Sequence, residues 1–274
     1  MEIKVVLLTG GSTGIGLQVA NQLMDKNVRV YSASRRTAAS CKSRNCQGEI
    51  IPVQMDVNNE NEISAVISRI LQENSRLDAV ICNAGNGIAG SVEDTSVEEM
   101  KYQFETNFFG SVKTIQACLP VFRSQGHGRV MVTSSVAAVV PIPYQAFYSA
   151  GKSALLTFIQ ALAVEVKPFG IECCAVLPGD TKTEFTAARR YTEKSLSDNS
   201  AYKERMKRSI RKMEKDEEKG MKPEFVAQKM VREIVAKRKM KAIVIPGTGY
   251  WMACGLFNIF PVKCRMWITG KLYN

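Results

Sequence analysis

The chain has 274 residues, and its 37 Lys and Arg against 26 Asp and Glu give a formal net charge of +11. Hydrophobic residues make up 45% and charged residues 23%, which is typical of a folded globular protein and excludes a disordered or collagen-like chain. Eight scattered cysteines lack C-x-x-C spacing, the one histidine (His127) leaves no His-rich metal site, and no signal peptide precedes the first apolar run. We therefore expect reduced thiols, no metal and a cytoplasmic location.

Short apolar runs alternate with helical patterns along the whole chain. The runs predict strands at Val5–Thr9, Arg29–Ala33, Ile50–Gln54, Ala79–Asn83, Val130–Ser134, Ile171–Leu177 and Ala242–Pro246. Apolar spacing predicts helices at Gly14–Met24, Glu60–Gln72, Glu98–Phe122, Tyr148–Lys167 and Glu224–Ala236. This alternation indicates an α/β fold, a doubly wound parallel (Rossmann-like) sheet covered on both faces, in a single domain over residues 1–274. The active site is expected beyond the carboxyl ends of the strands.

A glycine-rich turn joins the first predicted strand to the first predicted helix. It reads Thr9-Gly10-Gly11-Ser12-Thr13-Gly14-Ile15-Gly16, and its G-x-x-x-G-x-G spacing differs from the common G-x-G-x-x-G. Glycines let the backbone approach a pyrophosphate, and a helix N-terminus offers free N–H groups. A lone glycine-rich turn could be a plain strand-to-helix connection, but the strand before it and the helix after it indicate a dinucleotide-binding unit.

The end of the second predicted strand bears on the choice of dinucleotide. A cofactor without a 2′-phosphate is usually held by an Asp or Glu about 20 residues beyond the glycines. This chain has Ser34 at that position, followed by Arg35 and Arg36. Because guanidinium groups suit a phosphate, the missing acid and the two arginines favour NADP(H) over NAD(H), although a solvated basic loop would show the same residues.

Ser135, Tyr148 and Lys152 carry the chemistry that the sequence suggests. Tyr148 and Lys152 are four residues apart, so they share one face of a helix, and a nearby cation favours the phenolate of a tyrosine. Ser135 follows the fifth predicted strand and adds a hydroxyl donor. The three side chains together suit proton transfer to and from a carbonyl or an alcohol. A Tyr-x-x-x-Lys pair alone occurs often by chance, so its meaning depends on the motifs around it.

These features together resemble the short-chain dehydrogenase/reductase family. The matching motifs in chain order are Thr9-Gly10-x-x-x-Gly14-Ile15-Gly16, Asp56-Val57, Asn83-Ala84-Gly85, Asn107-x-x-Gly110, Ser135, Tyr148-x-x-x-Lys152 and Pro178-Gly179. The resemblance extends from about Val5 to the strand near Ile245. It departs from the family pattern at Cys82, where a second Asn is common, and at Thr181, where Val is common.

The resemblance implies roles for the matched residues. Tyr148 would be the acid or base at the substrate oxygen, and Lys152 would lower the pKa of Tyr148 and bind the ribose hydroxyls. Ser135 would polarise the carbonyl, and Asn107 would hold a water that links Lys152 to solvent. With the argument for the basic loop added, the expected cofactor site comprises Gly10, Ser12, Thr13, Gly14, Ile15, Gly16, Ser34, Arg35, Arg36, Asp56, Val57, Asn83, Ala84, Gly85, Tyr148, Lys152, Pro178, Gly179, Thr181 and Thr183.

Residues 180–222 are expected to form a lid over the substrate, because the resembling family carries one after its Pro-Gly motif. Lys182–Lys222 has thirteen basic and eight acidic residues, and the cluster Lys237-Arg-Lys-Met-Lys adds positive charge. An acidic substrate, a carrier protein or an anionic membrane would explain this charge, but a solvated helical face with interleaved acids is the preferred interpretation. The sequence has no nucleic-acid-binding module, so we expect no nucleic-acid partner.

A C-terminal extension, residues 247–274, follows the last predicted strand. Ala242–Val262 is uncharged for 21 residues, which is long enough to cross a bilayer, but its prolines and glycines argue against one continuous helix. Peripheral contact with a membrane is an alternative, through Trp251, Phe257, Phe260 and Trp267. Packing on the core, where the tail closes the substrate pocket or a subunit interface, is the favoured interpretation.

The sequence thus predicts an NADP(H)-dependent oxidoreductase that interconverts a carbonyl and a secondary alcohol on a bulky lipophilic substrate, such as a steroid or a retinoid. The side chains placed for an apolar pocket wall are Val139, Ile142, Phe147, Phe185 and Tyr191. A 3-oxoacyl thioester reductase is the alternative enzyme, and a cofactor-sensing regulatory protein without turnover is the alternative from another class. We expect a homodimer or a homotetramer.

Overall fold

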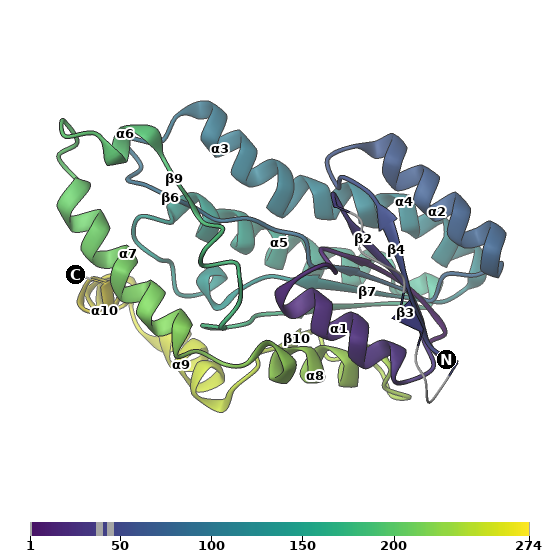
Figure 1. The fold of residues 1–274 in the computed structure, drawn as a ribbon. Coiled ribbons are helices and arrows are strands. Elements are labelled where there is room, and N and C mark those ends of the chain that lie inside the picture. Colours follow the sequence, from purple (N-terminus) through teal and green to yellow (C-terminus); the bar gives the residue numbers. More distant parts are fainter. Residues whose placement is uncertain (1, 37–40, 43–46, 274) are drawn as a thin grey trace.

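A mainly parallel sheet runs through the molecule, with helices on both of its faces (Figure 1). The computed structural model describes residues 2–36, 41–42 and 47–273. Its strands are β1 (Val5–Thr9), β2 (Arg29–Ser34), β3 (Cys41–Lys42), β4 (Glu49–Gln54), β5 (Ala79–Cys82), β6 (Ile88–Ala89), β7 (Gly128–Thr133), β8 (Ile171–Val176), β9 (Arg190–Tyr191) and β10 (Ile243–Val244). Its α-helices are α1 (Gly14–Met24), α2 (Glu60–Asn74), α3 (Val97–Phe104), α4 (Gly110–Gln125), α5 (Ala146–Glu165), α6 (Glu193–Leu196), α7 (Lys203–Glu218), α8 (Pro223–Ile234), α9 (Thr248–Ile259) and α10 (Val262–Tyr273).

The strand order places the predicted site at one edge of the sheet. The order is β10-β8-β7-β5-β1-β2-β4-β3, with β3 antiparallel to β4 and the other pairs parallel. The chain fills one half of the sheet from β1 outward and then crosses back to place β5 on the other side of β1. The carboxyl ends of β1 and β5 therefore form the switch point at which such sheets bind their ligands. All seven predicted strands are confirmed, although only Ile243 and Val244 of the last one pair with a neighbour.

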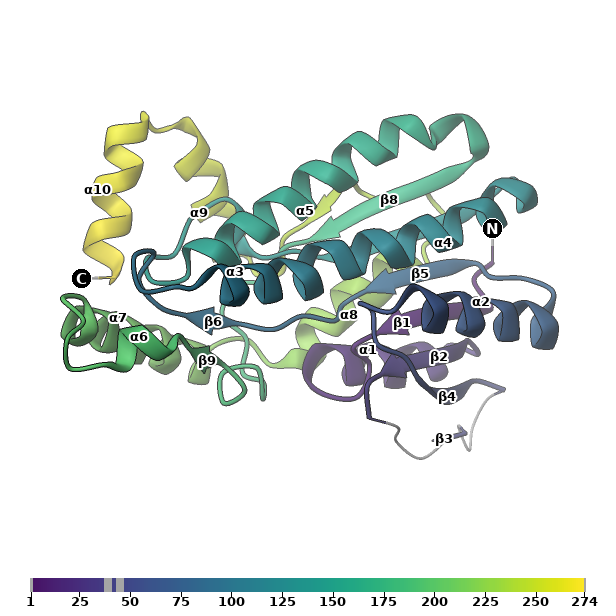
Figure 2. The same ribbon diagram turned by 90° about the horizontal axis from the view of Figure 1, so that it is seen from above.

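Both faces of the sheet are buried, as the apolar strands predict. Along β1 the side chains alternate, so that Val5 and Leu7 pack in one core cluster, and Val6 and Leu8 pack in the other. Helices α2, α4 and α5 cover the first face, and α1 and α8 cover the second (Figures 1 and 2). The doubly wound architecture follows from this two-sided burial.

The predicted helix Glu98–Phe122 is divided in the structure. A π-helical turn, Glu105–Phe109, separates α3 from α4, so the hydrogen bonds change register at that point. Periodicity alone did not reveal the turn, because residues on both sides continue a helical pattern.

Residues 180–222, the expected lid segment, contain helices, as the expected solvated helical face requires, and the tail contains two helices for which the sequence analysis gave no bounds. Helix α7 is strongly polar, and its buried apolar residues are Met206, Ile210 and Met213, at spacing i, i+4 and i+7, with Ser209 buried beside them. The tail forms α9 and α10, which are separated at Pro261, so the expectation that it is not one continuous helix is confirmed. Among the described residues, no helix combines the length and the apolar character needed to cross a membrane.

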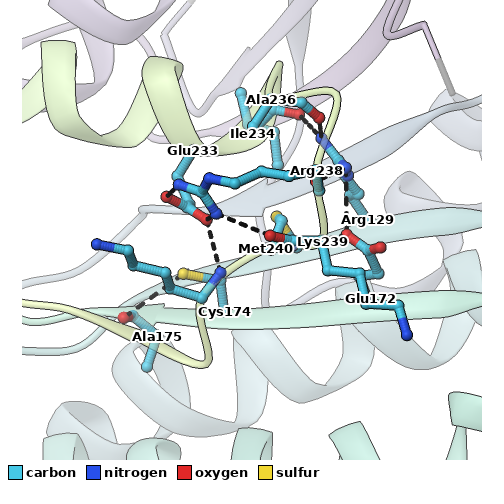
Figure 3. Close-up of polar contacts among 11 residues, drawn as sticks. Arg129, Glu172, Cys174, Ala175, Glu233, Ile234, Ala236, Arg238, Lys239 and Met240 are labelled. Carbon is cyan, nitrogen blue, oxygen red and sulfur yellow. Dashed lines mark hydrogen bonds and ion pairs between the residues drawn. The ribbon is translucent and has the colours of Figure 1, made fainter.

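A buried arginine ties α8 to the sheet at the end remote from the glycine-rich turn (Figure 3). Arg129, near the start of β7, donates from Nη1 to the carbonyls of Ile234 and Ala236, both at 2.7 Å, and from Nη2 to the carbonyl of Arg238 at 2.9 Å. Its Nη2 also lies 3.2 Å from a carboxylate oxygen of Glu172. The last carbonyls of a helix lack intrahelical partners, so Arg129 satisfies groups at the end of α8 and fixes the chain that leads to β10.

Candidate active site

The glycine-rich turn is fastened to the carboxyl end of β5. Gly10 has φ +67°, and a Cβ there would lie 2.7 Å from the Cα of Ala84, so only glycine fits. The hydroxyl of Thr9 accepts from the backbone N–H groups of Asn83 and Ala84, both at 3.1 Å. The amide of Asn83 donates in turn to the carbonyl of Gly10 at 3.1 Å. The turn and the end of β5 therefore meet at backbone distance, and we call this glycine-lined turn the cradle.

Helix α1 begins directly after this cradle. A Cβ on Gly16 would run into the carbonyl of Gly10, so helix and turn approach at backbone distance. Thr13 is the N-cap residue, but its side chain makes no capping hydrogen bond, and no acid lies in the first turn. A helix N-terminus of this kind suits an anion. Thr183 of the lid lies 3.3 Å from the point that a Cβ on Gly14 would occupy.

The basic loop at the end of β2 lies beside the same cradle. The N–H of Gly10 donates to the carbonyl of Ala33 at 2.8 Å, which joins the end of β2 to the turn. The hydroxyl of Ser34 donates to the carbonyl of Arg36, and the side chains of Arg35 and Arg36 are exposed. Both guanidinium groups are therefore accessible to a ligand that extends from the cradle.

Ser32 is a residue of this region that the sequence analysis missed. A Cβ on Gly11 would run into the hydroxyl of Ser32, so the second glycine packs directly on β2. The sequence signal that could have identified Ser32 is the small size of both residues, Gly11 in the turn and Ser32 in the neighbouring strand.

Asp56 and Val57 lie beyond the carboxyl end of β4. The carboxylate of Asp56 accepts from the N–H of Asn58 at 2.9 Å, and its own N–H donates to Glu62 at 2.7 Å. Val57 is buried, and one of its methyl carbons lies 2.6 Å from the point that a Cβ on Gly110 would occupy. The Asn-x-x-Gly motif thus allows α4 to approach the Asp-Val turn.

Ser135, Tyr148 and Lys152 come together beyond the end of β7. Ser135 lies close enough to Tyr148 to hold down the pKa of its phenol, while the hydroxyl of the neighbouring Ser134 donates to the carbonyl of Lys152 at 2.8 Å. The Nζ atom of Lys152 donates to the carbonyl of Thr133 at 2.8 Å and lies 5.8 Å from the centre of the Tyr148 ring. Ser135 is therefore the serine that faces the phenol, and Ser134 anchors α5.

Burial dominates the electrostatics of this trio. It raises the pKa of Tyr148 to about 12, with Glu217 adding to the rise, and the nearby Ser135 hydroxyl and the charge of Arg189 oppose it. Burial lowers the pKa of Lys152 to about 8. Lys152 is not among the groups that shift the pKa of Tyr148 here, and its ammonium donates to the Thr133 carbonyl, so the lowering of that pKa by Lys152 stays a prediction.

Asn107 lies in the π-helical turn and, like Lys152, beside Gly85. Its Nδ2 donates to the carbonyl of Asn86 and its Oδ1 accepts from the Asn86 N–H, both at 2.8 Å. A Cβ on Gly85 would lie 2.8 Å from Asn107 Oδ1 and 3.7 Å from Lys152 Nζ. The structure thus brings Asn107, Gly85 and Lys152 together, and the water relay through Asn107 stays a prediction.

The Pro178-Gly179 motif follows β8 and meets the tail. The carbonyl of Pro178 accepts from the N–H of Val136 at 3.0 Å, which places the motif beside Ser135. The ring of Tyr250 packs on Gly179 where a Cβ would be, and its hydroxyl donates to Asp180 at 2.9 Å. Thr181 donates to the carbonyl of Gly179 at 2.8 Å. The first turn of α9 therefore contacts the site.

The lid contributes a buried ion pair that the sequence analysis did not predict. The side chain of Arg189 is fully buried, and its Nη2 lies 2.6 Å from Glu217 and its Nη1 3.4 Å from Glu214. Phe185, expected at the pocket wall, has its ring centre 5.9 Å from that of Tyr148. The i, i+3 spacing of Glu214 and Glu217 on α7 was an available signal. Nothing in the sequence distinguishes Arg189 from its neighbour Arg190.

Comparisons with known proteins agree with this geometry. A family model described as short chain dehydrogenase matches residues 4–194. The chain is 36% identical over 238 residues to a 3-ketodihydrosphingosine reductase of Bacteroides thetaiotaomicron, which covers 87% of this chain and 86% of the relative. It is also 32% identical over 195 residues to the human 17-beta-hydroxysteroid dehydrogenase type 1. That match covers 68% of this chain and 59% of the human protein.

A solved structure shows the same fold over most of the chain. A short-chain dehydrogenase from Streptomyces avermitilis superimposes with a TM-score of 0.79 and 26% identity, and the match covers 92% of this chain and 91% of that one. The chain therefore belongs to the short-chain dehydrogenase/reductase family, whose members are oxidoreductases that act on CH–OH and C=O groups with NAD(P)(H).

Proposed function

We propose that this protein is an NADP(H)-dependent reductase of a lipophilic ketone, with Tyr148 as the proton donor to the substrate oxygen. The observation that carries the proposal is the arrangement of Ser135, Tyr148 and Lys152 beside the backbone cradle of the glycine-rich turn. A regulatory protein that only senses the cofactor would not need Ser135 beside the phenol of Tyr148.

The residues present fit a dinucleotide. The backbone cradle at Gly10 and Gly16 and the uncapped start of α1 would hold the pyrophosphate. The cofactor supplies the hydride, and the protein supplies binding, orientation and the proton. Ser135 would donate a hydrogen bond to the substrate carbonyl, and Tyr148 would transfer its proton to the same oxygen. The ammonium of Lys152 would stabilise the phenolate that remains.

The preference for NADP(H) rests on Arg35 and Arg36. Both are exposed at the end of β2, and Ser34 stands where an acid would bind the ribose of NAD(H). The substitution Arg35→Ala should weaken NADPH by roughly tenfold to a hundredfold, the scale of one charge-assisted hydrogen bond, while NADH changes little. Titration of both cofactors by fluorescence measures this, and an equal loss for both would show that Arg35 does not bind the 2′-phosphate.

A long-chain 3-keto sphingoid base is the substrate class with the most support. The 36% identical relative is named for the reduction of 3-ketodihydrosphingosine, which carries an amino group beside its ketone and a long alkyl chain. The match to that relative also spans most of both proteins, 87% of this chain and 86% of the relative.

Two other substrate classes remain as alternatives. A steroid or a retinoid is supported by the 32% identity to the human steroid dehydrogenase, over a smaller part of both chains. A 3-oxoacyl thioester is supported by the basic surface of the lid segment. Both would use the same trio at the carbonyl.

A substrate panel tests the proposal. NADPH oxidation is measured with 3-ketodihydrosphingosine, a 17-ketosteroid, retinal and acetoacetyl-CoA. The highest kcat/KM is expected with the sphingoid ketone. A higher value with the steroid, the retinoid or the thioester would overturn the substrate class, and no turnover with any of them, despite NADPH binding, would favour the regulatory protein.

A further inference from the structure

The C-terminal hairpin, α9 with α10, presents bulky apolar side chains to solvent. On α9 the exposed fractions are 65% for Trp251, 56% for Leu256 and 79% for Ile259, and on α10 Met266 and Trp267 are also largely exposed. A contiguous exposed apolar surface of this kind marks a site of interaction. We propose that the hairpin docks the protein on the surface of an anionic lipid bilayer.

Helix α9 is apolar on both of its faces. Tyr250, Cys254 and Phe257, at spacing i, i+4 and i+7, face the fold, and Cys254 and Phe257 are buried. The exposed side chains lie on the opposite face, and the twelve residues of α9 include no charged one. A helix that is apolar all round belongs in a nonpolar environment, and the fold supplies that environment for only half of it.

The hairpin has a fixed shape that suits a surface rather than a span. Arg265 of α10 donates from Nε to the carbonyl of Phe260 at 2.6 Å and from Nη2 to that of Asn258 at 2.8 Å. Its guanidinium also lies 5.7 Å from the ring centre of Phe257. Each helix has twelve residues, or about 18 Å, against about 30 Å of hydrocarbon in a bilayer, so neither can cross.

The positive charge of the hairpin indicates which kind of surface it would bind. Residues 242–274 contain Lys263, Arg265 and Lys271 and no acid, so the hairpin carries only positive charge. A second copy of the chain docked on this face by a two-fold axis would bring like charges together. Anionic headgroups are complementary to it, and tryptophans beside basic residues are typical of interfacial helices.

The lid adds positive charge at the same end of the molecule. Figures 1 and 2 show α10 beside α7, and the two helices are in contact. The exposed charged residues of α7 are five basic ones against three acidic ones, so this side has a net positive charge: Arg205, Arg208, Arg211, Lys212 and Lys215, with Glu204, Asp216 and Glu218. A bilayer attracted by one helix would be attracted by its neighbour as well.

Docking would bring the bilayer close to the active site. The inner face of α9 holds Tyr250 against Gly179 and Asp180, beside the Pro-Gly motif. A lipid substrate could then pass from the bilayer to Tyr148 without crossing water. This last step rests on the proposed function, whereas the docking itself does not.

Flotation of the full-length protein with vesicles tests the docking. Phosphatidylcholine vesicles with and without phosphatidylglycerol are compared at physiological salt, with no substrate present. The protein should float with the anionic vesicles. The variant Trp251→Ser/Leu256→Ser/Ile259→Ser should bind at least about tenfold more weakly, because it loses three exposed apolar side chains that the bilayer would bury. Val164→Ser, which changes a 74% exposed apolar residue of α5, is the matched control and should bind normally.

A second variant keeps the test independent of folding. Lys263→Ala/Lys271→Ala should bind vesicles with phosphatidylglycerol more weakly, while its binding to vesicles of phosphatidylcholine alone stays unchanged. NADPH binding is measured for each variant to confirm that it is folded. Failure of the unaltered protein to float with anionic vesicles would overturn the proposal. So would a triple variant that binds vesicles normally but has a smaller assembly in gel filtration, since the surface would then join copies of the chain. Flotation without any ketone turnover would count against the proposed function alone.

Discussion

Removal of the buried guanidinium of Arg189 is expected to loosen the lid. In Arg189→Ala the carboxylates of Glu214 and Glu217 lose their cation while their side chains remain only 29% and 13% exposed. Breaking a buried pair costs about 3–5 kcal/mol, and the partial exposure of both acids favours the lower end. A cost of about 3 kcal/mol corresponds to a shift of roughly a hundredfold in the local unfolding equilibrium of α7.

Hydrogen exchange of the α7 amides measures this equilibrium directly. Arg190→Ala is the matched control, because Arg190 is exposed and contacts only the ring face of Tyr102, at 4.8 Å, among the contacts described for its side chain. It should change exchange by less than about fivefold, as expected for an exposed cation over an aromatic ring. The double variant Arg189→Met/Glu217→Gln should recover part of the loss, because one stranded charge is removed. Equal exchange in Arg189→Ala and Arg190→Ala would refute the reasoning.

Three further predictions concern the site. Tyr148→Phe should lower kcat by at least about a hundredfold with little change in NADPH affinity, because the proton donor is lost. The control Tyr144→Phe should keep most turnover, and similar losses of kcat in both variants would contradict the role of Tyr148. The kcat/KM for ketone reduction should fall as the pH rises through about 8. Burial lowers the pKa of Lys152 to about 8, so its amine is charged below that pH and neutral above it. A kcat/KM that does not change around pH 8 in the unaltered protein would count against this. Gly10→Ala should lower the free energy of unfolding by about 1–3 kcal/mol and weaken the binding of NADPH, since its Cβ would lie 2.7 Å from the Cα of Ala84 and its φ is +67°. An unchanged free energy of unfolding together with an unchanged NADPH affinity would exclude that clash.

Much of the sheet could be predicted because its strands are buried on both faces. Such strands appear as continuous apolar runs, and turn residues mark where they end. Helix α1 was placed at Gly14–Met24, the bounds found in the structure, because glycines and an apolar stripe define its start and face. Ser135, Tyr148 and Lys152 could be grouped because strand ends and helix faces fix where such side chains lie.

The rest depends on contacts between segments that are distant in the sequence. The burial of Arg189 is decided by the packing of the lid on α7, so its charge in the sequence suggested a solvated surface. The raised pKa of Tyr148 follows from desolvation, which spacing cannot report. Helix α9 was not predicted because Gly249 and Gly255 lower the helix propensity of its sequence. In the structure the helix is supported by tertiary packing, since Tyr250 on its inner face lies against Gly179.

The π-helical turn at Glu105–Phe109 has a consequence for how this chain can vary in length. The turn holds one residue more than regular α-helical hydrogen bonding would require, and Asn107 lies within it. Deleting a single residue there would restore regular α-helical hydrogen bonding while α3 and α4 keep their phase, because the wider π-helical turn takes up the extra residue. The change would fall at Asn107, however, and its two bonds to Asn86 would be lost. A one-residue deletion would therefore leave both helices intact and disrupt the site between them.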